Sequence, residues 1–209
     1  KDDFGTNPCS EIILRSREFC NLSECVIRRE DSRESLKEKV RVATILGTFQ
    51  STLTEFKYLS REWKRNCDEE RLLGVSLTGI MDNPITNGTR GGLSKLLEEL
   101  RDIAYETNKE WAEKLGIPPS AAITCVKPSG TVSQLVDSAS GIHARHNPFY
   151  IRTVRADNKD PLCKLMQDMK FPNEVDVTKP EHTTVFSFPM KSPKGAVFRM
   201  DMSAIEQLE

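Results

Sequence analysis

The sequence has no long apolar run and no excess of charge of either sign. No stretch approaches the roughly 20 apolar residues that a transmembrane helix needs, so no membrane contact is predicted. The N-terminal residues KDDFGTNPCSEI lack the basic and then apolar profile of a signal peptide. These absences favour a cytoplasmic protein.

The charge balance also argues against a nucleic-acid partner. Thirty Lys and Arg residues nearly cancel thirty-one Asp and Glu residues, whereas binding to nucleic acid depends on positive charge that displaces counterions from phosphates. The apolar share of 37% and the charged share of 29% lie on the polar side of globular usage, short of the composition of disordered chains. A chain of 209 residues can form one or two domains.

Cysteine is too sparse for a disulfide scaffold, with six residues in the whole chain. A zinc site at Cys9, Cys20 and Cys25 is a weak alternative, because the chain lacks two C-x₂₋₄-C pairs; no metal site is predicted. Four cysteines are interpreted as packing or incidental thiols: Cys25, Cys67, Cys125 and Cys163.

Helical periodicity is the main secondary-structure signal, with apolar residues at three- and four-residue steps. The predicted helices cover residues 32–59, 61–73, 93–115 and 161–169. In the first, Ser32 and Ser35 are candidate caps. Its predicted buried face consists of Val42, Ile45, Leu46, Phe49, Leu53 and Phe56. Gly116 is suited to end the third helix.

Short apolar runs predict buried strands at residues 121–126, 149–154 and 183–188, and residues 75–81 form a further apolar run. The breaker-rich residues 82–92 predict a surface loop. Strands that alternate with long helices favour an α/β fold with a mainly parallel sheet or barrel. The first residues run straight into a turn and the last ones read as the start of a helix, so we expect a piece of a longer protein.

The densest chemical signal is NPCSEI, in which Asn7, Cys9 and Glu11 occupy alternate positions. In an extended segment these side chains would project to one side. A thiol can act as a nucleophile or as a hydrogen-atom carrier, a carboxylate can accept a proton, and an amide can orient a hydroxyl. Solvated polar residues without a function are the alternative at this point.

A second signal is PSGTVSQL, residues 128–135, directly after a predicted strand. Its backbone N–H groups and hydroxyls can surround a phosphate if a helix begins at Val132 or Ser133. The GxxxxGK[ST] pattern of a P-loop is absent, and a capped turn is the alternative. Lys127 and Arg152 can neutralise phosphate charge or be ordinary surface bases.

Six short blocks of this sequence match, in the same order, blocks found in one protein family. They are NPCSEI, FCNL, LGTFQSTLTEFKYL, ERLLGVSLTGIMD, KPSGTVSQLVDSASGIHARHNPFYIRTVRAD and TTVFSFPMKSPKGAV. Over nearly all of its length the chain resembles the adenosylcobalamin-dependent, class II ribonucleotide reductases. This resemblance implies that residues 1–209 are a portion of one catalytic domain, a ten-stranded α/β barrel. Its finger loop would be residues 4–13 and its phosphate-binding loop residues 128–134.

The resemblance also implies roles for individual residues. Cys9 matches the cysteine that becomes a thiyl radical and removes the 3′ hydrogen of the ribose. Asn7 and Glu11 match the residues that hold the 2′ and 3′ hydroxyls, with Glu11 as the base at the 3′ oxygen. Cys20 matches one of two cysteines that become a disulfide, and its partner lies upstream in the family. The phosphate-binding residues would be Ser129, Gly130, Thr131, Val132 and Ser133.

The implied cofactor is adenosylcobalamin, the substrate a ribonucleotide, with triphosphates favoured, and the reductant thioredoxin or a similar dithiol. The product would be a deoxyribonucleotide for DNA synthesis, and the 209-residue chain alone is expected to be inactive. Two alternatives remain: a class I, metal-partner-dependent diphosphate reductase and a nucleotide-binding relative without catalysis. The thiols Cys9 and Cys20 argue against the second, and GIHARH and FYIRTVR favour the cobalamin class over the first. The roles of His143, Arg145 and His146 stay open.

Overall fold

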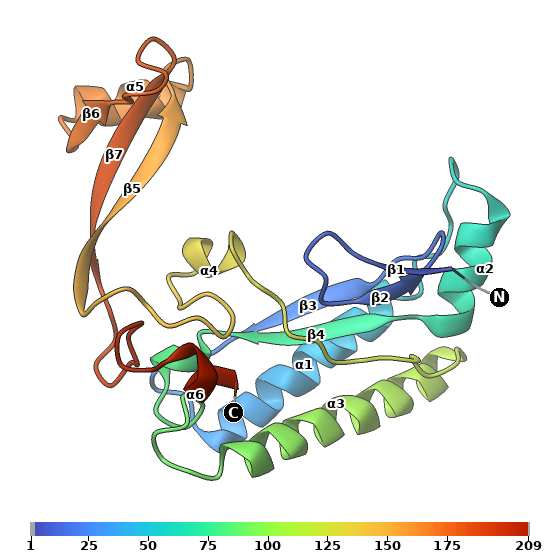
Figure 1. Cartoon of the computed structure of the whole chain (residues 1–209). Helices are drawn as coiled ribbons and strands as arrows, with labels where there is room; N and C mark the ends of the chain where they lie inside the picture. The colour runs from blue at the N-terminus through green and yellow to red at the C-terminus, as the bar shows by residue number, and fades with distance from the viewer. Residues whose placement is uncertain (1–2, 209) are drawn as a thin grey trace. The chain divides into compact units, whose positions relative to one another are not determined.

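The structure is a computed structural model that describes residues 3–208, and it forms two compact units. The first unit comprises the chain up to Arg145 together with the stretch from Lys194 onward, and the second is His146–Pro193. The elements, labelled in Figure 1, are β1 (Phe4–Thr6), β2 (Ile13–Arg15), β3 (Asn21–Val26), α1 (Arg33–Gln50), α2 (Arg61–Glu70), β4 (Leu73–Thr78), the 3₁₀ turn η1 (Ile80–Asp82), α3 (Leu93–Leu115), α4 (Val132–Leu135), β5 (Phe149–Asp157), α5 (Pro161–Asp168), β6 (Asn173–Val175), β7 (Thr183–Lys191) and α6 (Ala204–Leu208).

Strand β4 lies at the centre of the first unit. It pairs with β3 in parallel, from Asn21 opposite Leu73 to Val26 opposite Thr78. On its other edge, residues 121–125 run beside it, with a parallel bridge between Val75 and Thr124 and a 2.8 Å bond from the Val75 N–H to the Ile123 carbonyl. Residues 121–126 are predicted from the sequence to form a strand. Their backbone runs alongside β4, but only one residue, Thr124, forms a β-bridge with it.

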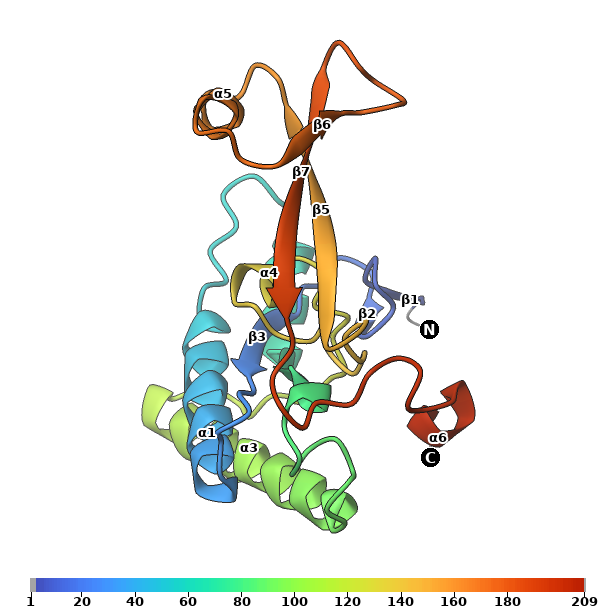
Figure 2. The ribbon, with the colours of Figure 1, turned by 90° about the vertical axis from the view of Figure 1, so that its left-hand side faces the viewer.

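Helices α1 and α3 pack against each other and cover one face of this sheet, as both ribbon views show (Figures 1 and 2). The core between them and the strands consists of fully buried apolar side chains, among them Ile27, Leu36, Leu73, Leu96 and Ala104. Helix α3 has the predicted bounds and ends at Gly116, whose φ of 67° is the left-handed conformation that glycine adopts without strain.

The buried face of α1 differs from the predicted one. The helix ends at Gln50, and Val42, Leu46 and Leu53 of the predicted apolar face are 44%, 61% and 72% exposed. The buried side is formed instead by Leu36, Val40, Ala43, Thr44, Gly47 and Thr48. Small residues let the helix approach β4, and the threonine hydroxyls can be buried because each donates to the carbonyl four residues earlier, at 2.8 Å. The predicted cap is confirmed, since Ser32 and Ser35 form a capping box.

The predicted surface loop at residues 82–92 is wrong in its first half. Asp82, Asn83, Thr86 and Asn87 are at most 2% exposed. The Asn83 amide donates to three backbone carbonyls after β3, those of Arg28, Arg29 and Asp31, at 2.7, 3.2 and 3.0 Å. The breaker residues therefore form a buried polar junction, because their side chains satisfy backbone groups that would otherwise lack partners.

The second unit is a three-stranded antiparallel sheet with the order β5-β7-β6 and the short helix α5 (Figure 2). Its long strands confirm the predictions at 149–154 and 183–188 and extend beyond them, and α5 confirms the predicted helix at 161–169. The expectation of mainly parallel pairing is wrong here, since β7 pairs in antiparallel fashion with both β5 and β6. Helix α5 follows β5 in the chain, but it does not serve as a crossover between parallel strands. The prediction of a single barrel domain over residues 1–209 stays a prediction. Within residues 3–208, no helix combines the length and apolar character that crossing a bilayer requires.

The neighbouring residues Leu96 and Leu97 offer a matched test of the core. Leu96 is fully buried and Leu97 is 41% exposed. We expect Leu96→Ala to lower the free energy of unfolding by about 2–5 kcal/mol, since it leaves a cavity, and Leu97→Ala by less than about 1 kcal/mol. Urea unfolding followed by circular dichroism measures both. Equal losses would contradict the observed packing of α3.

Candidate active site

The loop at Cys9 is the tip of a β-hairpin. Strands β1 and β2 pair in antiparallel fashion from Phe4 opposite Arg15 to Thr6 opposite Ile13. The Asn7 N–H donates to the Ile12 carbonyl at 3.2 Å, and the Ile12 N–H donates to the Asn7 side-chain oxygen at 3.2 Å. Residues 7–11 are not extended, so the condition for their alternate side chains to project to one side is not met; the chain reverses there, with Ser10 at a φ of 61°. The loop is closed by its own hydrogen bonds.

Cys9 and Glu11 nevertheless come together, through a third residue. The ammonium of Lys127 lies 2.9 Å from Glu11 Oε1 and 3.9 Å from Cys9 Sγ. Cys9 is exposed in the chain, whereas the Glu11 side chain is only 2% exposed. The second carboxylate oxygen of Glu11 has no hydrogen-bond partner among the described residues. The cluster thus presents an exposed thiol beside a buried carboxylate, one of whose oxygens makes no hydrogen bond among the described residues.

The charge of Glu11 is held by this cluster. Burial of the carboxyl raises its pKa, but hydrogen bonds, first that from Lys127, outweigh burial and hold the pKa below its usual value. The same contact raises the pKa of Lys127. Glu11 is therefore ionised at neutral pH and can accept a proton. Sequence patterns could not predict this pair, since its members lie 116 positions apart.

Two more thiols gather over Gly74 in the middle of β4. A Cβ atom at Gly74 would lie 3.0 Å from Cys125 Sγ, 3.3 Å from Cys20 Sγ and 2.5 Å from Leu22 Cδ2. Burial raises the pKa of Cys20 to about 12, with a further contribution from Cys125. Burial and the charge of Glu11 raise the pKa of Cys125 to about 11. Both groups are protonated thiols at neutral pH, and Cys125, interpreted from sequence as incidental, lies at the candidate site.

The candidate phosphate-binding loop contains one buried hydroxyl that lacks a partner. Ser129 is 4% exposed, has a φ of 53°, and its Oγ makes no hydrogen bond within the described residues. Gly130, Thr131 and Val132 are exposed. Ser133 differs, because its buried hydroxyl donates to the Ser129 carbonyl and so stabilises the loop. Helix α4 begins at Val132 as predicted, but it has only four residues.

Comparison with known proteins gives these features a context. No protein-family model matches the chain. The adenosylcobalamin-dependent ribonucleoside-triphosphate reductase of Lactobacillus delbrueckii subsp. bulgaricus is 27% identical over 213 residues, which cover 90% of this chain and 28% of the reductase. The protein of the same name from Euglena gracilis is 29% identical over 204 residues, which cover 98% of this chain and 27% of the reductase.

A solved structure agrees with the sequence comparison. The crystal structure of a B12-dependent, class II ribonucleotide reductase superimposes with a TM-score of 0.74 and 25% identity, covering 93% of this chain and 30% of that chain. The chain is thus similar, in sequence and in structure, to adenosylcobalamin-dependent ribonucleotide reductases. The predicted resemblance to class II reductases and the α/β fold are confirmed. The chain spans less than a third of the length of these reductases.

The Glu11–Lys127 pair predicts a change in proton affinity. In Lys127→Met the pKa of Glu11 should rise, because burial then acts without the opposing hydrogen bond. The pair stabilises the fold above the unfolded-state pKa of Glu11, and this contribution is lost as the pH falls through the lower folded pKa. Carbon-13 NMR titration of the carboxyl groups, with Glu11 assigned by Glu11→Gln, measures the pKa. Lys109→Met, at an exposed position of α3, is the control, and an unchanged pKa in Lys127→Met would contradict the assigned cause.

Proposed function

We propose that this chain is part of the catalytic barrel of an adenosylcobalamin-dependent ribonucleotide reductase that converts ribonucleoside triphosphates to 2′-deoxyribonucleotides for DNA synthesis. The observation that carries the proposal is the grouping of Cys9, Glu11 and Lys127 at a hairpin tip. It occurs in a chain whose relatives bear that reductase name over 90% or more of its length. Strands β3 and β4 with helices α1 and α3 would form one sector of the ten-stranded barrel, and residues 4–13 its finger loop.

Within this proposal each residue of the hairpin has one task. Cys9, as a thiyl radical, removes the 3′ hydrogen of the ribose and re-forms its S–H bond. Glu11 accepts the proton of the 3′ hydroxyl at its unpartnered oxygen. This helps the 2′ hydroxyl leave as water, with the proton for the water supplied by one of the two thiols that later form the disulfide. Asn7 accepts a bond from the Ile12 N–H at its side-chain oxygen, so its NH₂ group is the part that can donate to a ribose hydroxyl.

The reduction needs two electrons, which two thiols supply when they form a disulfide. Cys20 supplies one thiol, and the resemblance places its partner in an upstream region. Thioredoxin or a similar dithiol then returns the disulfide to two thiols. The upstream cysteine is therefore required, and the 209-residue chain alone should not turn over.

The cofactor must reach the thiol of Cys9. Adenosylcobalamin bound beside Cys9 would supply, by homolysis of its cobalt–carbon bond, the radical chemistry that oxidises this thiol. Cys9 fits that role because its side chain is exposed at the loop tip in this chain. In the full-length enzyme the loop must be enclosed by the rest of the barrel, because a thiyl radical has to be shielded from solvent.

The decisive experiment uses the full-length protein, purified without other proteins and assayed with a dithiol. We expect deoxyribonucleotide formation only when adenosylcobalamin is added. Cys9→Ser should reduce formation below about one-thousandth of the wild-type rate while substrate still binds, since a hydroxyl hydrogen is too strongly bound for radical transfer. Activity that requires a diiron or dimanganese protein instead would overturn the class II proposal.

Cys20→Ser is the matched control, because it changes a thiol in the same site. It should still permit removal of the 3′ hydrogen, followed by loss of free base from the unreduced substrate. Tritium released from 3′-labelled nucleotide separates the two variants. Release by Cys9→Ser, or none by Cys20→Ser, would contradict the assigned roles.

The loop proposal concerns Ser129, Gly130, Thr131, Val132 and Ser133 as the binding site for the substrate phosphates. Its support is the unpartnered Ser129 hydroxyl. Ser129→Ala should change the free energy of unfolding by less than about 0.5 kcal/mol, since it removes no internal hydrogen bond, yet weaken nucleoside triphosphate binding about tenfold.

Ser133→Ala is the control for this prediction. It removes the hydrogen bond to the Ser129 carbonyl and should cost about 1 kcal/mol of stability. Equilibrium dialysis with the triphosphate and urea unfolding measure the two quantities. A Ser129→Ala protein that loses stability but binds like wild type would refute the assignment.

A further inference from the structure

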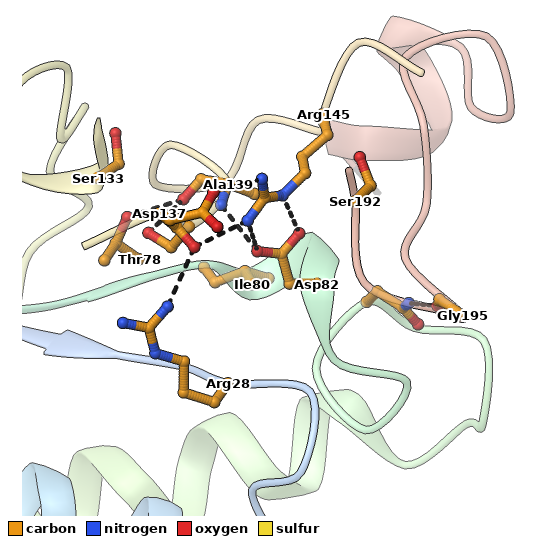
Figure 3. Close-up of polar contacts among 12 residues, drawn as sticks. Arg28, Thr78, Ile80, Asp82, Ser133, Asp137, Ala139, Arg145, Ser192 and Gly195 are labelled. Carbon is orange, nitrogen blue, oxygen red and sulfur yellow. Dashed lines mark hydrogen bonds and ion pairs between the residues drawn. The ribbon is translucent and has the colours of Figure 1, made fainter. Parts of the chain in front are cut away.

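Arg145, in the GIHARH block, forms a buried ion pair with Asp82. Its Nε lies 2.9 Å from Asp82 Oδ1 and its Nη2 lies 3.0 Å from Asp82 Oδ2 (Figure 3). The two side chains are 4% and 3% exposed. Two parallel hydrogen bonds between a planar guanidinium and a carboxylate fix both distance and orientation.

The same guanidinium also holds Asp137, the second residue after α4. Its Nη1 lies 2.9 Å from Asp137 Oδ1, and its Nη2 donates to the Asp137 carbonyl at 2.9 Å. Arg28 Nη1 donates to that carbonyl as well, at 3.0 Å (Figure 3). Asp137 has a φ of 47°, which is strained for a residue other than glycine. The ion pairs therefore hold a strained turn at the end of the candidate phosphate-binding loop.

The segment after Asp137 is tied to the end of β4. Asp82 Oδ2 accepts the Ala139 N–H at 2.8 Å, and Thr78 Oγ1 donates to the Ala139 carbonyl at 3.0 Å. The Gly141 N–H in turn donates to Thr78 Oγ1 at 2.9 Å. One carboxylate, that of Asp82, thus connects the Arg145 side chain to the backbone of residues 137–141.

This segment in turn fixes the loop itself. The Ser138 N–H donates to the Ser133 carbonyl at 2.8 Å, and Ser140 Oγ donates to the Ser129 carbonyl at 2.9 Å. A Cβ at Gly141 would lie 2.6 Å from the carbonyl of Lys127, so the backbones before and after the loop are in close contact. A continuous path of hydrogen bonds and backbone contacts therefore leads from the Arg145–Asp82 pair to Ser129.

We propose that Arg145 is a positioning residue for the substrate phosphates: through Asp82 and Asp137 it sets the conformation of residues 129–141. The inference rests on the proposed function, because it assumes that this loop binds the phosphates. It gives the GIHARH arginine a role without contact to the nucleotide. A buried ion pair adds little net stability compared with well-packed apolar residues, so what it supplies here is defined geometry.

The test compares four variants of the full-length protein. Arg145→Met and Asp82→Asn each break the central pair. Arg71→Met is the control, because Arg71 is also a mostly buried arginine, 10% exposed, whose guanidinium bonds the Ser51 carbonyl and Asp68, far along the chain from residues 129–141. Asp137→Asn is a fourth variant for the case in which Arg145→Met or Asp82→Asn prevents folding. Its side chain is 63% exposed, so the substitution should leave the fold intact.

Two measurements distinguish positioning from mere stabilisation. We expect faster hydrogen–deuterium exchange confined to residues 129–141 in Arg145→Met and Asp82→Asn. The KM for ribonucleoside triphosphate should rise about tenfold while kcat stays within about twofold. Arg71→Met should show neither change at a similar loss of thermal stability. Faster exchange throughout the unit, or loosening of the loop with an unchanged KM, would overturn the proposal.

The outcome can be separated from that of the proposed function. If the wild-type protein reduces no nucleotide, the reductase assignment fails, but binding of the triphosphate by equilibrium dialysis still tests the role of Arg145. Weaker binding by Arg145→Met than by Arg71→Met supports positioning, and equal binding refutes it.

Discussion

The parallel alignment of β4 with β3 on one edge and with residues 121–125 on the other is the constraint on which the candidate site depends. Parallel neighbours bring their carboxyl ends to one edge of the sheet, which is where α/β folds place binding residues. Asp82 follows β4 and Lys127 follows the third segment, so both leave from this edge. A one-residue change of register between two of these segments would turn the side chains of the shifted segment to the other face of the sheet, and the groups at this edge would no longer meet.

A second constraint on the site is the absence of a side chain at Gly74 of β4. Gly74 presents no side chain where Cys20, Cys125 and Leu22 converge, and any Cβ there would collide with at least one of them. On the opposite side of the sheet, the approach of Gly47 to β4 is looser, since its added Cβ would lie 3.4 Å from Leu73, an ordinary van der Waals distance. Two glycines thus let the helix pack closely on one side and let thiols gather on the other.

Local patterns predicted the elements better than they predicted the faces of those elements. Helix α3 could be read with its bounds because one stripe of apolar residues and a terminal glycine agree with each other. The face of α1 could not, because its buried side uses threonines and a glycine whose burial depends on bonds within the helix and on contact with a distant strand. Cys9 and Glu11 stood out by spacing alone. Lys127 and Cys125 did not, because only the fold brings residues more than a hundred positions apart into contact.

Charge and burial shift the pKa values of Glu11 and Cys20 in opposite directions, and so give the two groups different chemical roles. Hydrogen bonds, first that from Lys127, lower the pKa of Glu11, whereas burial raises the pKa of Cys20 to about 12. At neutral pH the carboxyl is therefore ready to accept a proton, and the thiol keeps its own. A nucleophilic cysteine would need the opposite shift, toward the thiolate. A thiol that must deliver a hydrogen together with an electron has to stay protonated, so the buried environment of Cys20 suits reduction of a radical rather than nucleophilic attack.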